Sequence, residues 1–381
     1  MSGNKKNLSR NRYMLKGALK RKGYDWWWHS FTGRNKITGE EKTFFIEYFI
    51  INPAKSPREV VFGQSDIGNI IGNRSQNSLK PCYVMIKAGV WGNKAKQIHA
   101  FYPIKDLSIR RKEFQLKVGN CVLSENYISG AVEMSPLDAA THPEYMSASG
   151  TMSWNLRVDK QIAYNPGYGT SWLARKLNLF QMYWYAQGAK TEYSGKVFLD
   201  GVEYDVRAER SFGYADKNWG SDFTKPWIWL SSCDLISQIS GRRLKNSCFD
   251  IGGGCPQVCG IPFKNKVLVF FQYENKSYEF NFSHFWKKSS VKFSFLEGER
   301  LLHWTVTAEN SSSLLDVDIY CNVDDALFIN YESPSGKKTF DRLWNCGCGY
   351  GEIKLFKKNR KTLELVEDAK VSHCGCEYGE S

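Results

Sequence analysis

The sequence predicts an all-β protein with two antiparallel barrel or sandwich domains and few helices. Aromatic residues make up 15% of the chain, and such residues are enriched in strands and in large apolar pockets. Short runs of aromatic and β-branched residues recur along the chain, separated by Gly, Asn, Asp and Pro, as in strands joined by turns. The length of 381 residues is more than a single hydrophobic core usually serves, so it favours two domains.

The expected strands are distributed over the whole chain. Phe44–Ile51 is a clear example, because the run FFIEYFII ends at Asn52 and Pro53, which interrupt a strand. Asp200-Gly201 lies between two apolar runs, a pattern typical of a tight hairpin. The other expected strands are Cys82–Ala88, Phe114–Val118, Lys196–Leu199, Trp227–Ser232, Lys266–Tyr273, Val291–Phe295, Leu301–Thr307, Leu314–Tyr320 and Gly351–Phe356.

Helical patterns are few. Ser171–Tyr185 is the best, because apolar residues recur at three- and four-residue steps and Ser171 suits an N-cap. A loop that leads into a strand is the alternative interpretation of this run. A shorter helix is expected around Asn11–Lys20.

The chain is expected to consist of a basic N-terminal arm and two domains. Eight basic residues and no acidic ones lie between Met1 and Tyr24, so we define residues 1–22 as a basic N-terminal arm. Such a run is typical of a solvated tail, and it also suits peripheral contact with an anionic membrane surface. We expect no nucleic-acid partner, because the rest of the chain carries no nucleic-acid-binding module. We place the domain junction near Asp222, giving domains 23–222 and 223–381.

The sequence also predicts where the protein works. No apolar run of signal-peptide length follows the N-terminal charges, and no stretch of about 18 apolar residues occurs. The chain has 11 Cys, an odd number, which favours free thiols in a reducing compartment. We therefore expect a cytoplasmic protein that associates with a membrane, if at all, only at its surface.

Ser211–Trp229 is the segment richest in chemistry. It combines six aromatic residues with the adjacent pair Asp216 and Lys217 and with Asn218. Polar groups among indoles suit an apolar pocket with a few placed hydrogen bonds. The alternative is a packing knot between the domains, in which the charged pair is merely neutralised or solvated. Trp227 and Trp229 should share one face of a strand, since side chains alternate along it.

This segment resembles the central signature of tocopherol cyclases. The matching residues are the block Asp216-Lys217-Asn218-Trp219-Gly220, then Phe223, then Trp227-Ile228-Trp229. Looser similarity extends to Phe44–Pro53, Gly89–Gly92, Trp154–Leu156, Gly195–Val197, Asp200–Tyr204 and Gly252–Gly254. The resemblance implies two lipocalin-like barrels with a ligand cleft between or within them. It also implies similarity to carotenoid hydratases and pericyclic cyclases.

The chemistry implied by the resemblance is protonation of an alkene, followed by capture of the cation by an oxygen. No cofactor is needed. A buried carboxyl with a raised pKa can serve as the acid, and aromatic faces stabilise a cation. Asp216 is the first candidate for the acid, followed by Asp222 and Asp234, with Lys217 or Asn218 to orient it. The expected substrate-binding residues are Trp219, Phe223, Trp227, Trp229, Asp234, Trp27 and Trp28. Core packing is the alternative role for Trp27 and Trp28.

Two Cys-x-Cys pairs near the C-terminus form a second candidate site. Cys346, Cys348, Cys374 and Cys376 could together supply four thiolates to a structural zinc ion. The Cys-x-Cys spacing lacks the knuckle turn of common zinc sites, so buried thiols are the main expectation and a redox pair is a further alternative. We therefore expect no metal.

Two functions remain open on sequence grounds. The first is a cofactor-independent cyclase, isomerase or hydratase that acts on a prenylated or polyene substrate. The second is a non-catalytic protein that binds a hydrophobic small molecule on the same scaffold, because a fold does not determine a function. An acid catalyst needs a buried carboxyl beside its ligand, whereas a binder needs only apolar walls.

Overall fold

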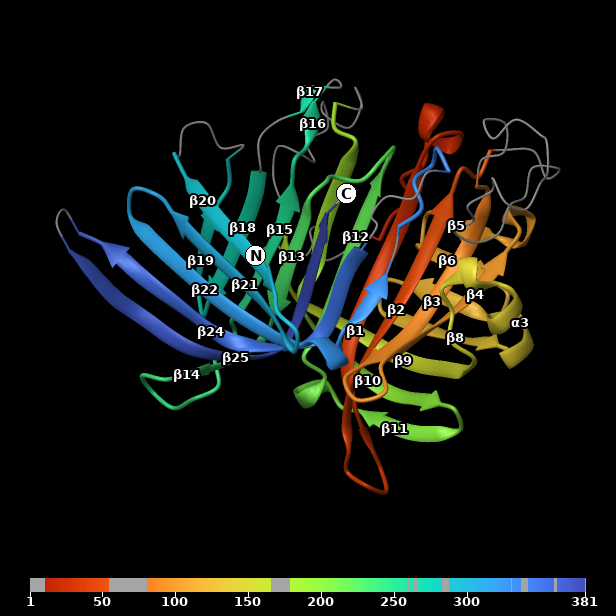
Figure 1. Cartoon of the computed structure of the whole chain (residues 1–381), viewed down its shortest axis with the longest axis horizontal. Coiled ribbons are helices and arrows are strands. Elements are labelled where there is room, and N and C mark those ends of the chain that lie inside the picture. Colours follow the sequence, from red (N-terminus) through yellow and green to blue (C-terminus); the bar gives the residue numbers. More distant parts are fainter. Residues whose placement is uncertain are drawn as a thin grey trace.

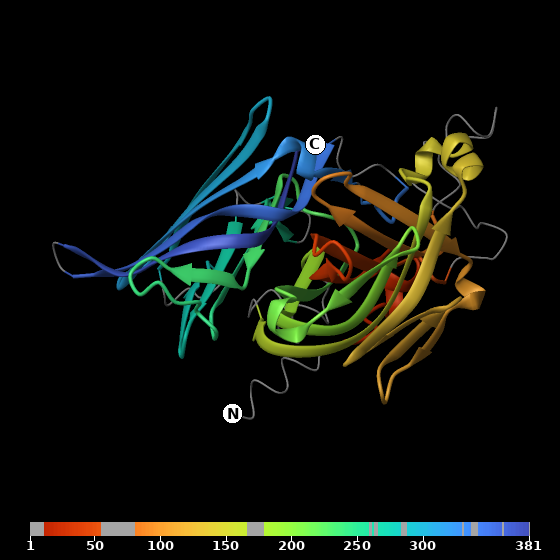
Figure 2. The same cartoon turned by 90° about the horizontal axis from the view of Figure 1, so that it is seen from below.

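The computed structural model consists almost wholly of antiparallel strands in two large sheets (Figure 1). It describes residues 11–54, 81–165, 179–258, 261–262, 266–282, 288–329, 331–336, 342–359 and 362–380. The predicted fold class, all-β with lipocalin-like barrel or sandwich sheets and few helices, is confirmed. The chain passes from the first sheet to the second between Gly220 and Trp227. Seen from below, the first sheet curves around its own core while the second is more open (Figure 2).

The first sheet has 12 strands in the order β4-β3-β2-β1-β11-β10-β9-β8-β7-β6-β5, and β12 pairs with both β1 and β10. Asp200 and Gly201 have positive φ angles of 48° and 81° and form the predicted hairpin between β10 and β11. The strands are β1 (Tyr24–Asn35), β2 (Glu41–Ile51), β3 (Tyr83–Trp91), β4 (Lys96–Tyr102), β5 (Ser108–Arg110), β6 (Gln115–Val118), β7 (Cys121–Ser124), β8 (Tyr127–Met134), β9 (Gly150–Tyr164), β10 (Met182–Leu199), β11 (Val202–Val206) and β12 (Gly213–Gly220).

The second sheet has 11 strands, with the main order β19-β18-β15-β13-β25-β24-β22-β21-β20. Off this path, β14 pairs with β25 and β23 pairs with β24, while β16 and β17 form a separate ribbon. The strands are β13 (Trp227–Ser232), β14 (Asp234–Ser237), β15 (Cys248–Gly254), β16 (Gln257–Val258), β17 (Ile261–Pro262), β18 (Lys266–Tyr273), β19 (Lys276–Phe280), β20 (Ser290–Glu297), β21 (Leu301–Glu309), β22 (Ser313–Asn322), β23 (Leu327–Ile329), β24 (Arg342–Lys358) and β25 (Leu363–Glu380).

Helices are short. The α-helix α3 spans Pro136–Thr141, and its N-cap Ser135 accepts a hydrogen bond from the backbone N–H of Asp138 at 3.0 Å. The 3₁₀ turns are η1 (Gly17–Lys20), η3 (Ile104–Asp106), η4 (Pro143–Tyr145), η6 (Ala208–Arg210) and η7 (Val323–Asp325). None of the helices in the described ranges is both long and apolar enough to cross a membrane.

Both helix predictions need correction. The helix expected over Ser171–Tyr185 is wrong at its C-terminal end, because Met182–Tyr185 begin β10 and pair with β12. Residues 171–178 lie outside the described residues. Ladder hydrogen bonds to two neighbouring strands outweigh a local helical periodicity here. Around Asn11–Lys20, only Gly17–Lys20 is helical, as one 3₁₀ turn.

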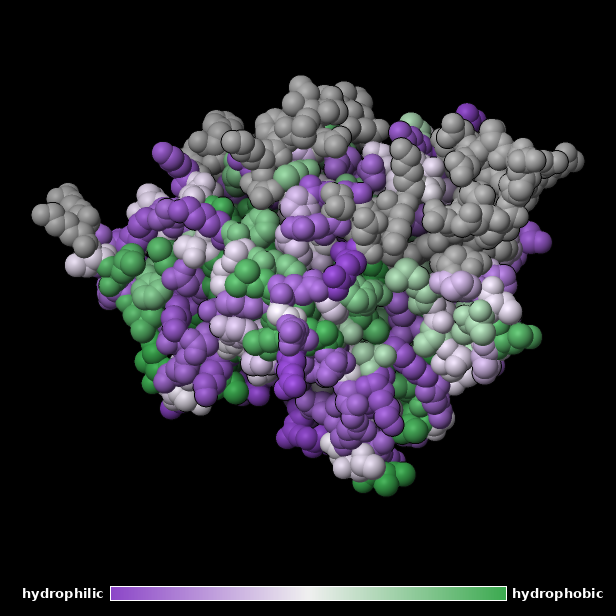
Figure 3. Space-filling model, in the orientation of Figure 1, coloured by the Kyte–Doolittle hydropathy of each residue, from purple (hydrophilic) through white to green (hydrophobic). Residues whose placement is uncertain are grey.

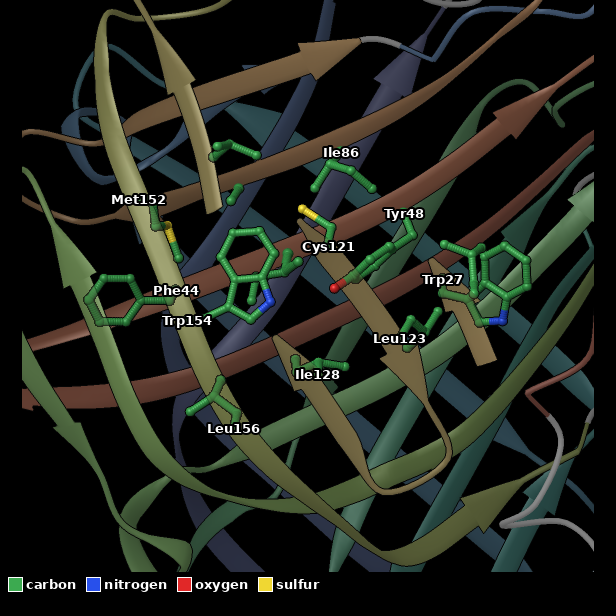
Figure 4. Close-up of a cluster of buried hydrophobic side chains, with 14 of the residues drawn as sticks. Trp27, Phe44, Tyr48, Ile86, Cys121, Leu123, Ile128, Met152, Trp154 and Leu156 are labelled. Atoms are coloured by element: carbon green, nitrogen blue, oxygen red, sulfur yellow. The ribbon is translucent and has the colours of Figure 1, made fainter. Parts of the chain in front are cut away.

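Three clusters of buried side chains form the interior. One lies inside the first sheet, where Trp27, Tyr48, Trp154 and Leu156 pack together (Figure 4). Another lies on the face of the second sheet that carries Ile228 and Leu230, opposite to Trp227 and Trp229. The third lies between the two sheets and takes residues from both. The visible surface carries apolar residues scattered among hydrophilic ones (Figure 3), which is ordinary for a folded domain.

Part of the basic arm belongs to the fold. Residues 1–10 lie outside the described residues, but Asn11 and Leu15 are fully buried. The backbone N–H of Met14 donates to Oδ2 of Asp25 at 2.7 Å. The interpretation of residues 1–22 as a solvated tail therefore does not hold from Asn11 to Leu15, because burial and this hydrogen bond tie that stretch to β1.

Asp25 and Lys217 form an ion pair inside the first sheet. Both side chains are completely buried, and Nζ of Lys217 also lies 3.6 Å from the centre of the Trp27 ring. Burial raises the pKa of Asp25 to about 6 and lowers the pKa of Lys217 to about 8. Each charge therefore depends on its partner, because an unpaired charge in this position would lose its hydration without compensation.

Replacement of Lys217 by Met should destabilise the protein strongly. The substitution leaves the Asp25 carboxyl buried without its cation, which typically costs about 3–5 kcal/mol. Urea unfolding at pH 8 measures the loss. Lys196→Met is the matched control, because its pair with Glu203 is solvent-exposed and such pairs contribute less than about 1 kcal/mol. Equal losses in the two variants would contradict the assignment.

Candidate functional site

The layer between the two sheets is aromatic, and it contains buried carboxyl groups. Strand β12 contributes to it with alternate side chains, so Tyr214 and Asp216 face the layer while Lys217 and Trp219 face the core of the first sheet. All eight residues of β12 are buried. Strand β13 starts the second sheet in the same way, with Trp227 and Trp229 in the layer.

Asp216 is held by donors from three strands. Its Oδ1 accepts a hydrogen bond from the indole N–H of Trp26 at 3.3 Å. Its Oδ2 accepts one from the indole N–H of Trp184 at 2.9 Å and one from the hydroxyl of Tyr214 at 3.3 Å. These contacts fix the carboxyl in a surrounding of aromatic rings, since Trp26, Trp184 and Tyr214 all belong to the interlayer cluster.

Asp250 brings a second carboxyl from the opposite sheet. It lies on β15, is completely buried, and its Oδ1 accepts the indole N–H of Trp229 at 3.2 Å. Its Oδ2 lies 3.3 Å from the hydroxyl of Tyr214, which also contacts Asp216. One phenol therefore bridges two carboxyl groups that come from different sheets.

Glu377 is the third carboxyl of the layer. It lies on β25 and accepts hydrogen bonds from the indole N–H of Trp227 at 2.6 Å, the hydroxyl of Tyr331 at 2.9 Å and the amide of Asn345 at 2.6 Å. Burial raises its pKa. The recurring arrangement is thus a carboxyl that accepts from an indole N–H, which satisfies both groups without solvent.

A buried ion pair lies in the same layer. Nζ of Lys87 on β3 is 2.6 Å from Oε2 of Glu47 on β2, and both side chains are almost completely inaccessible. These two residues are cross-strand neighbours, and Glu47 is in turn a neighbour of Trp28, which pairs with Asp216. The layer therefore carries a row of polar and aromatic groups across four strands.

Desolvation controls the protonation of these aspartates. Burial raises the pKa of Asp216 from 3.8 to about 7, although the hydrogen bonds from Trp184 and Trp26 oppose the shift. The proximity of Glu377 raises it further. Burial also raises the pKa of Asp250 well above its ordinary value, and the negative charge of Asp216 adds to that effect. Both groups can therefore hold a proton near neutral pH.

An apolar cavity lies beside this cluster. It has a volume of about 100 Å³ and is lined by Met182, Trp184, Trp227, Gly252, Leu268 and Phe282, among others. Trp184 belongs to both sites, because it lines the cavity and donates its N–H to Asp216. Trp227 links the cavity to Glu377 in the same way. The cavity is therefore one side chain away from Asp216 and from Glu377.

The structure brings several residues predicted from sequence into this layer. Phe223, Trp227, Trp229 and Trp28 all belong to the interlayer cluster, and Trp28 is the cross-strand partner of Asp216. Phe223 stacks on Tyr24 with ring centres 4.2 Å apart. These four residues therefore lie in the same layer as the acid, and Trp227 and Trp229 donate to the other carboxyls of that layer, Glu377 and Asp250.

Three other predicted residues lie on the opposite face of the strands. Trp219 and Trp27 belong to the core of the first sheet, where Trp219 stacks on Tyr183 at 5.4 Å. Lys217 pairs with Asp25 and donates no hydrogen bond to Asp216 in the described contacts. Period-two alternation along β12 separates Lys217 from its sequence neighbour.

Asn218, Asp222 and Asp234 occupy three different surroundings. Oδ1 of Asn218 accepts the hydroxyl of Tyr24 at 2.8 Å, within the interlayer. Asp222 is exposed, so it is not one of the buried carboxyls of the layer. Asp234 pairs with Arg243 and, at 2.7 Å, with Nδ1 of His373. Asp234 therefore belongs to an ion-pair network outside the aromatic layer.

The Cys-x-Cys pairs have a packing explanation. Cys346, Cys374 and Cys376 are completely buried in the core of the second sheet, and no group of three or more metal-ligating side chains occurs in the part of the chain that the structure describes. The central residues are glycines, and a Cβ at Gly347 or Gly375 would collide with the ring of Trp91 or Trp229. Each glycine thus admits an indole ring, while the small thiols fill the core on the other side.

Sequence reasoning missed Asp250, Glu377, Trp26, Trp184 and Tyr214 as site residues. Tyr214 precedes Asp216 by two positions, so strand alternation placed it on the same face and was a usable signal. Asp250 and Glu377 come from β15 and β25. Their position beside Asp216 depends on how the two sheets pack, and no local pattern reports it.

Solved structures with similar architecture have low sequence identity to this chain. They include an AttH protein from Nitrosomonas europaea (11% identity, 93% of this chain and 92% of that chain, TM-score 0.48). CghA with Sch210972 shows 10% identity over 95% of this chain and 89% of that chain (TM-score 0.46). Kievitone hydratase from Nectria haematococca shows 11% identity over 98% and 95% (TM-score 0.47).

The family assignment comes from the sequence itself. None of the curated proteins matches this chain significantly. The sequence profile of the tocopherol cyclase-like family, in contrast, matches residues 86–380. The matched region includes Asp216, Asp250 and Glu377 with most of both sheets. The chain belongs to the tocopherol cyclase-like family.

Proposed function

We propose that the protein is a cofactor-independent acid catalyst that protonates an alkene of a prenylated or polyene substrate. Asp216 is the acid, and the cation is captured by an oxygen or loses a proton, as in a cyclase, hydratase or isomerase. The observation that carries the proposal is the carboxyl of Asp216, buried among indole rings with its pKa raised to about 7. Family membership supports the same class of reaction.

The local surroundings suit this chemistry. An acid with a pKa near the working pH is protonated often enough to donate and acidic enough to transfer its proton. The indole N–H groups of Trp26 and Trp184 stabilise the carboxylate that remains, as donors placed in advance of the reaction do. The aromatic faces of Trp28, Trp227 and Trp229 supply π density for a carbocation in a buried layer.

The cavity indicates the kind of substrate. Its lining is almost wholly apolar, with aromatic and aliphatic side chains and glycines, so it favours a hydrocarbon chain over a polar head group. Trp184 lies between this space and Asp216, because it contacts both. The ring of Trp184 therefore borders a substrate held in this space, while its N–H holds the acid.

A non-catalytic binder of a hydrophobic small molecule is the second candidate. The apolar cavity alone favours it, because apolar walls bind a hydrocarbon without any acid. Native mass spectrometry of the purified protein, followed by lipid extraction, separates the two functions. A binder releases an unchanged ligand, whereas the acid catalyst converts an added alkene substrate.

Asp216→Asn should abolish conversion and isotope uptake. A panel of prenylated phenols and polyenes is incubated with the protein in deuterated water, and product mass is measured by liquid chromatography–mass spectrometry. The wild type should give a product with one deuteron on carbon, and the variant should lose at least about 100-fold of the rate, as expected for removal of a general acid.

The control for this experiment is Asp106→Asn, which changes an exposed carboxyl in η3. It should convert the substrate like the wild type. Deuterium uptake by Asp216→Asn at the wild-type rate would disprove the role of Asp216. Binding of the panel without conversion by the wild type would favour the binder.

The raised pKa of Asp216 should also appear as pH-dependent stability. A carboxyl whose pKa rises on folding, here from 3.8 to about 7, contributes stability below pH 4 that is lost as the pH rises through 7. At about 1.4 kcal/mol per pKa unit, the penalty approaches about 4 kcal/mol. Asp216→Asn should remove this pH-dependent penalty. The difference in unfolding free energy between variant and wild type should therefore grow between pH 5 and pH 8.

Urea unfolding at a series of pH values measures this effect. The Asp106→Asn control should run parallel to the wild type, because its carboxyl is exposed in the folded state. A constant difference between Asp216→Asn and wild type over this range would show that the pKa of Asp216 is not raised.

A further inference from the structure

Tyr214 makes two contacts that a single hydroxyl proton cannot serve equally. Its oxygen lies 3.3 Å from Oδ2 of Asp216 and 3.3 Å from Oδ2 of Asp250. A phenol donates one hydrogen bond, and ionised carboxylates only accept. Both contacts are full hydrogen bonds when one of the two carboxyls is protonated and donates to Tyr214, while Tyr214 donates to the other.

The surroundings favour one shared proton. Both carboxyls are buried, and their other hydrogen bonds come from indole N–H groups of Trp26, Trp184 and Trp229, which do not ionise. In the described ranges neither carboxyl forms an ion pair with a lysine, arginine or histidine. Two carboxylates close together in a site of low polarity cannot both stay charged, so such pairs retain a proton.

We propose that Asp250 is a positioning residue that stores the catalytic proton, and that Tyr214 passes this proton to Asp216. The inference rests on the proposed function, because Asp216 is the group that meets the alkene. The proton path would connect the two sheets. Asp216 and Tyr214 come from β12 of the first sheet, and Asp250 comes from β15 of the second. The acid is therefore complete only when both sheets are packed.

The proton balance closes over one turnover. The O–H bond of Asp216 breaks as a C–H bond forms on the alkene, and both carboxyls are then ionised. Capture of the cation breaks an O–H bond of the attacking hydroxyl, and that proton returns to the pair. A proton that arrives on Asp250 moves to the oxygen of Tyr214 while the original proton of Tyr214 moves to Asp216. No oxidant, reductant or metal takes part.

Infrared spectroscopy tests the shared proton without a substrate. At pH 8 the wild type should show the C=O stretching band of a protonated carboxylic acid, shifted in deuterated water. Asp250→Asn should lose the part of this absorption that belongs to the pair, because an uncharged amide no longer forces Asp216 to share a proton. The contribution of Glu332, whose pKa burial raises to about 8, should remain. Tyr214→Phe should keep the band but move it to higher frequency, since the acid loses its phenol acceptor.

Tyr164→Phe is the matched control for these spectra. Tyr164 is a buried tyrosine of the same layer, and its hydroxyl makes no hydrogen bond to either aspartate. The carboxylic acid band of the pair should stay at its wild-type frequency, because Tyr164 acts on Asp250 only through charge and the contacts of Tyr214 with both aspartates remain. A full set of wild-type bands in Asp250→Asn, or an unshifted band in Tyr214→Phe, would overturn the proposal.

The pH profile of kcat/KM gives a second readout that a purely structural role would not move. In the wild type the pair keeps its proton to a high pH, because its loss places two negative charges side by side. In Asp250→Asn the alkaline limb should shift to lower pH by at least about one unit. The other ionisable groups that act on the pair are Tyr24, Tyr164, Tyr193, Tyr331, Cys248, Lys217 and Glu377.

The outcomes separate the inference from the proposed function. If Asp216→Asn abolishes turnover while Asp250→Asn leaves the alkaline limb in place, Asp250 does not store the proton, but Asp216 remains the acid. If Asp216→Asn retains turnover, the proposed function fails, and the infrared spectra alone decide whether the two carboxyls share a proton. A variant that unfolds is recognised by its circular dichroism, and Tyr214→Phe then replaces it in the pH profile.

Discussion

The desolvation of carboxyl groups between two packed sheets is the constraint on which the rest of the structure depends. A carboxyl removed from water needs hydrogen bonds or a proton, and this fold supplies both. Indole N–H groups from both sheets meet Asp216, Asp250 and Glu377, which explains why so many tryptophans are concentrated here. The same indoles present apolar faces to the neighbouring space, so the groups that stabilise the fold also form the walls of the candidate site.

Strand alternation separates the two charged residues of β12, Asp216 and Lys217, so that each has a different role. Asp216 and Lys217 are adjacent in sequence but lie on opposite faces of β12, where Lys217 neutralises Asp25 inside the first sheet. Asp216 therefore lacks a cation and keeps a raised pKa. Had both side chains faced the same layer, an ion pair would have held the aspartate ionised at neutral pH. The acid depends on this separation as much as on its burial.

The ten strands named from sequence were located correctly because their signal is local: aromatic runs bounded by turn residues identify a strand without knowledge of its partners. Others, including β1, β9, β12 and β25, were not named. The segment from Asp216 to Trp229 also indicated the candidate site, because carboxyl, amide and indole groups lie close together in it. The rest could not be predicted in this way. Asp250 lies in an unremarkable run before three glycines, and only the packing of β15 against the first sheet gives it a role. The expected helix at Ser171–Tyr185 failed for a related reason, since β12 recruits Met182–Tyr185 into a ladder.

Glycines make this packing possible, because they leave room for the indole rings between the two sheets. A Cβ at Gly252 would lie 3.2 Å from the ring of Trp184, and one at Gly375 would collide with Trp229. The second sheet is therefore hollowed where the indoles that bind Asp216 and Asp250 must fit. Larger residues at these glycines would push the sheets apart, lengthen the contacts through Tyr214 and admit water to the carboxyls. Water would lower the pKa of both aspartates, so these glycines contribute to the acidity of the site by letting the indoles pack closely.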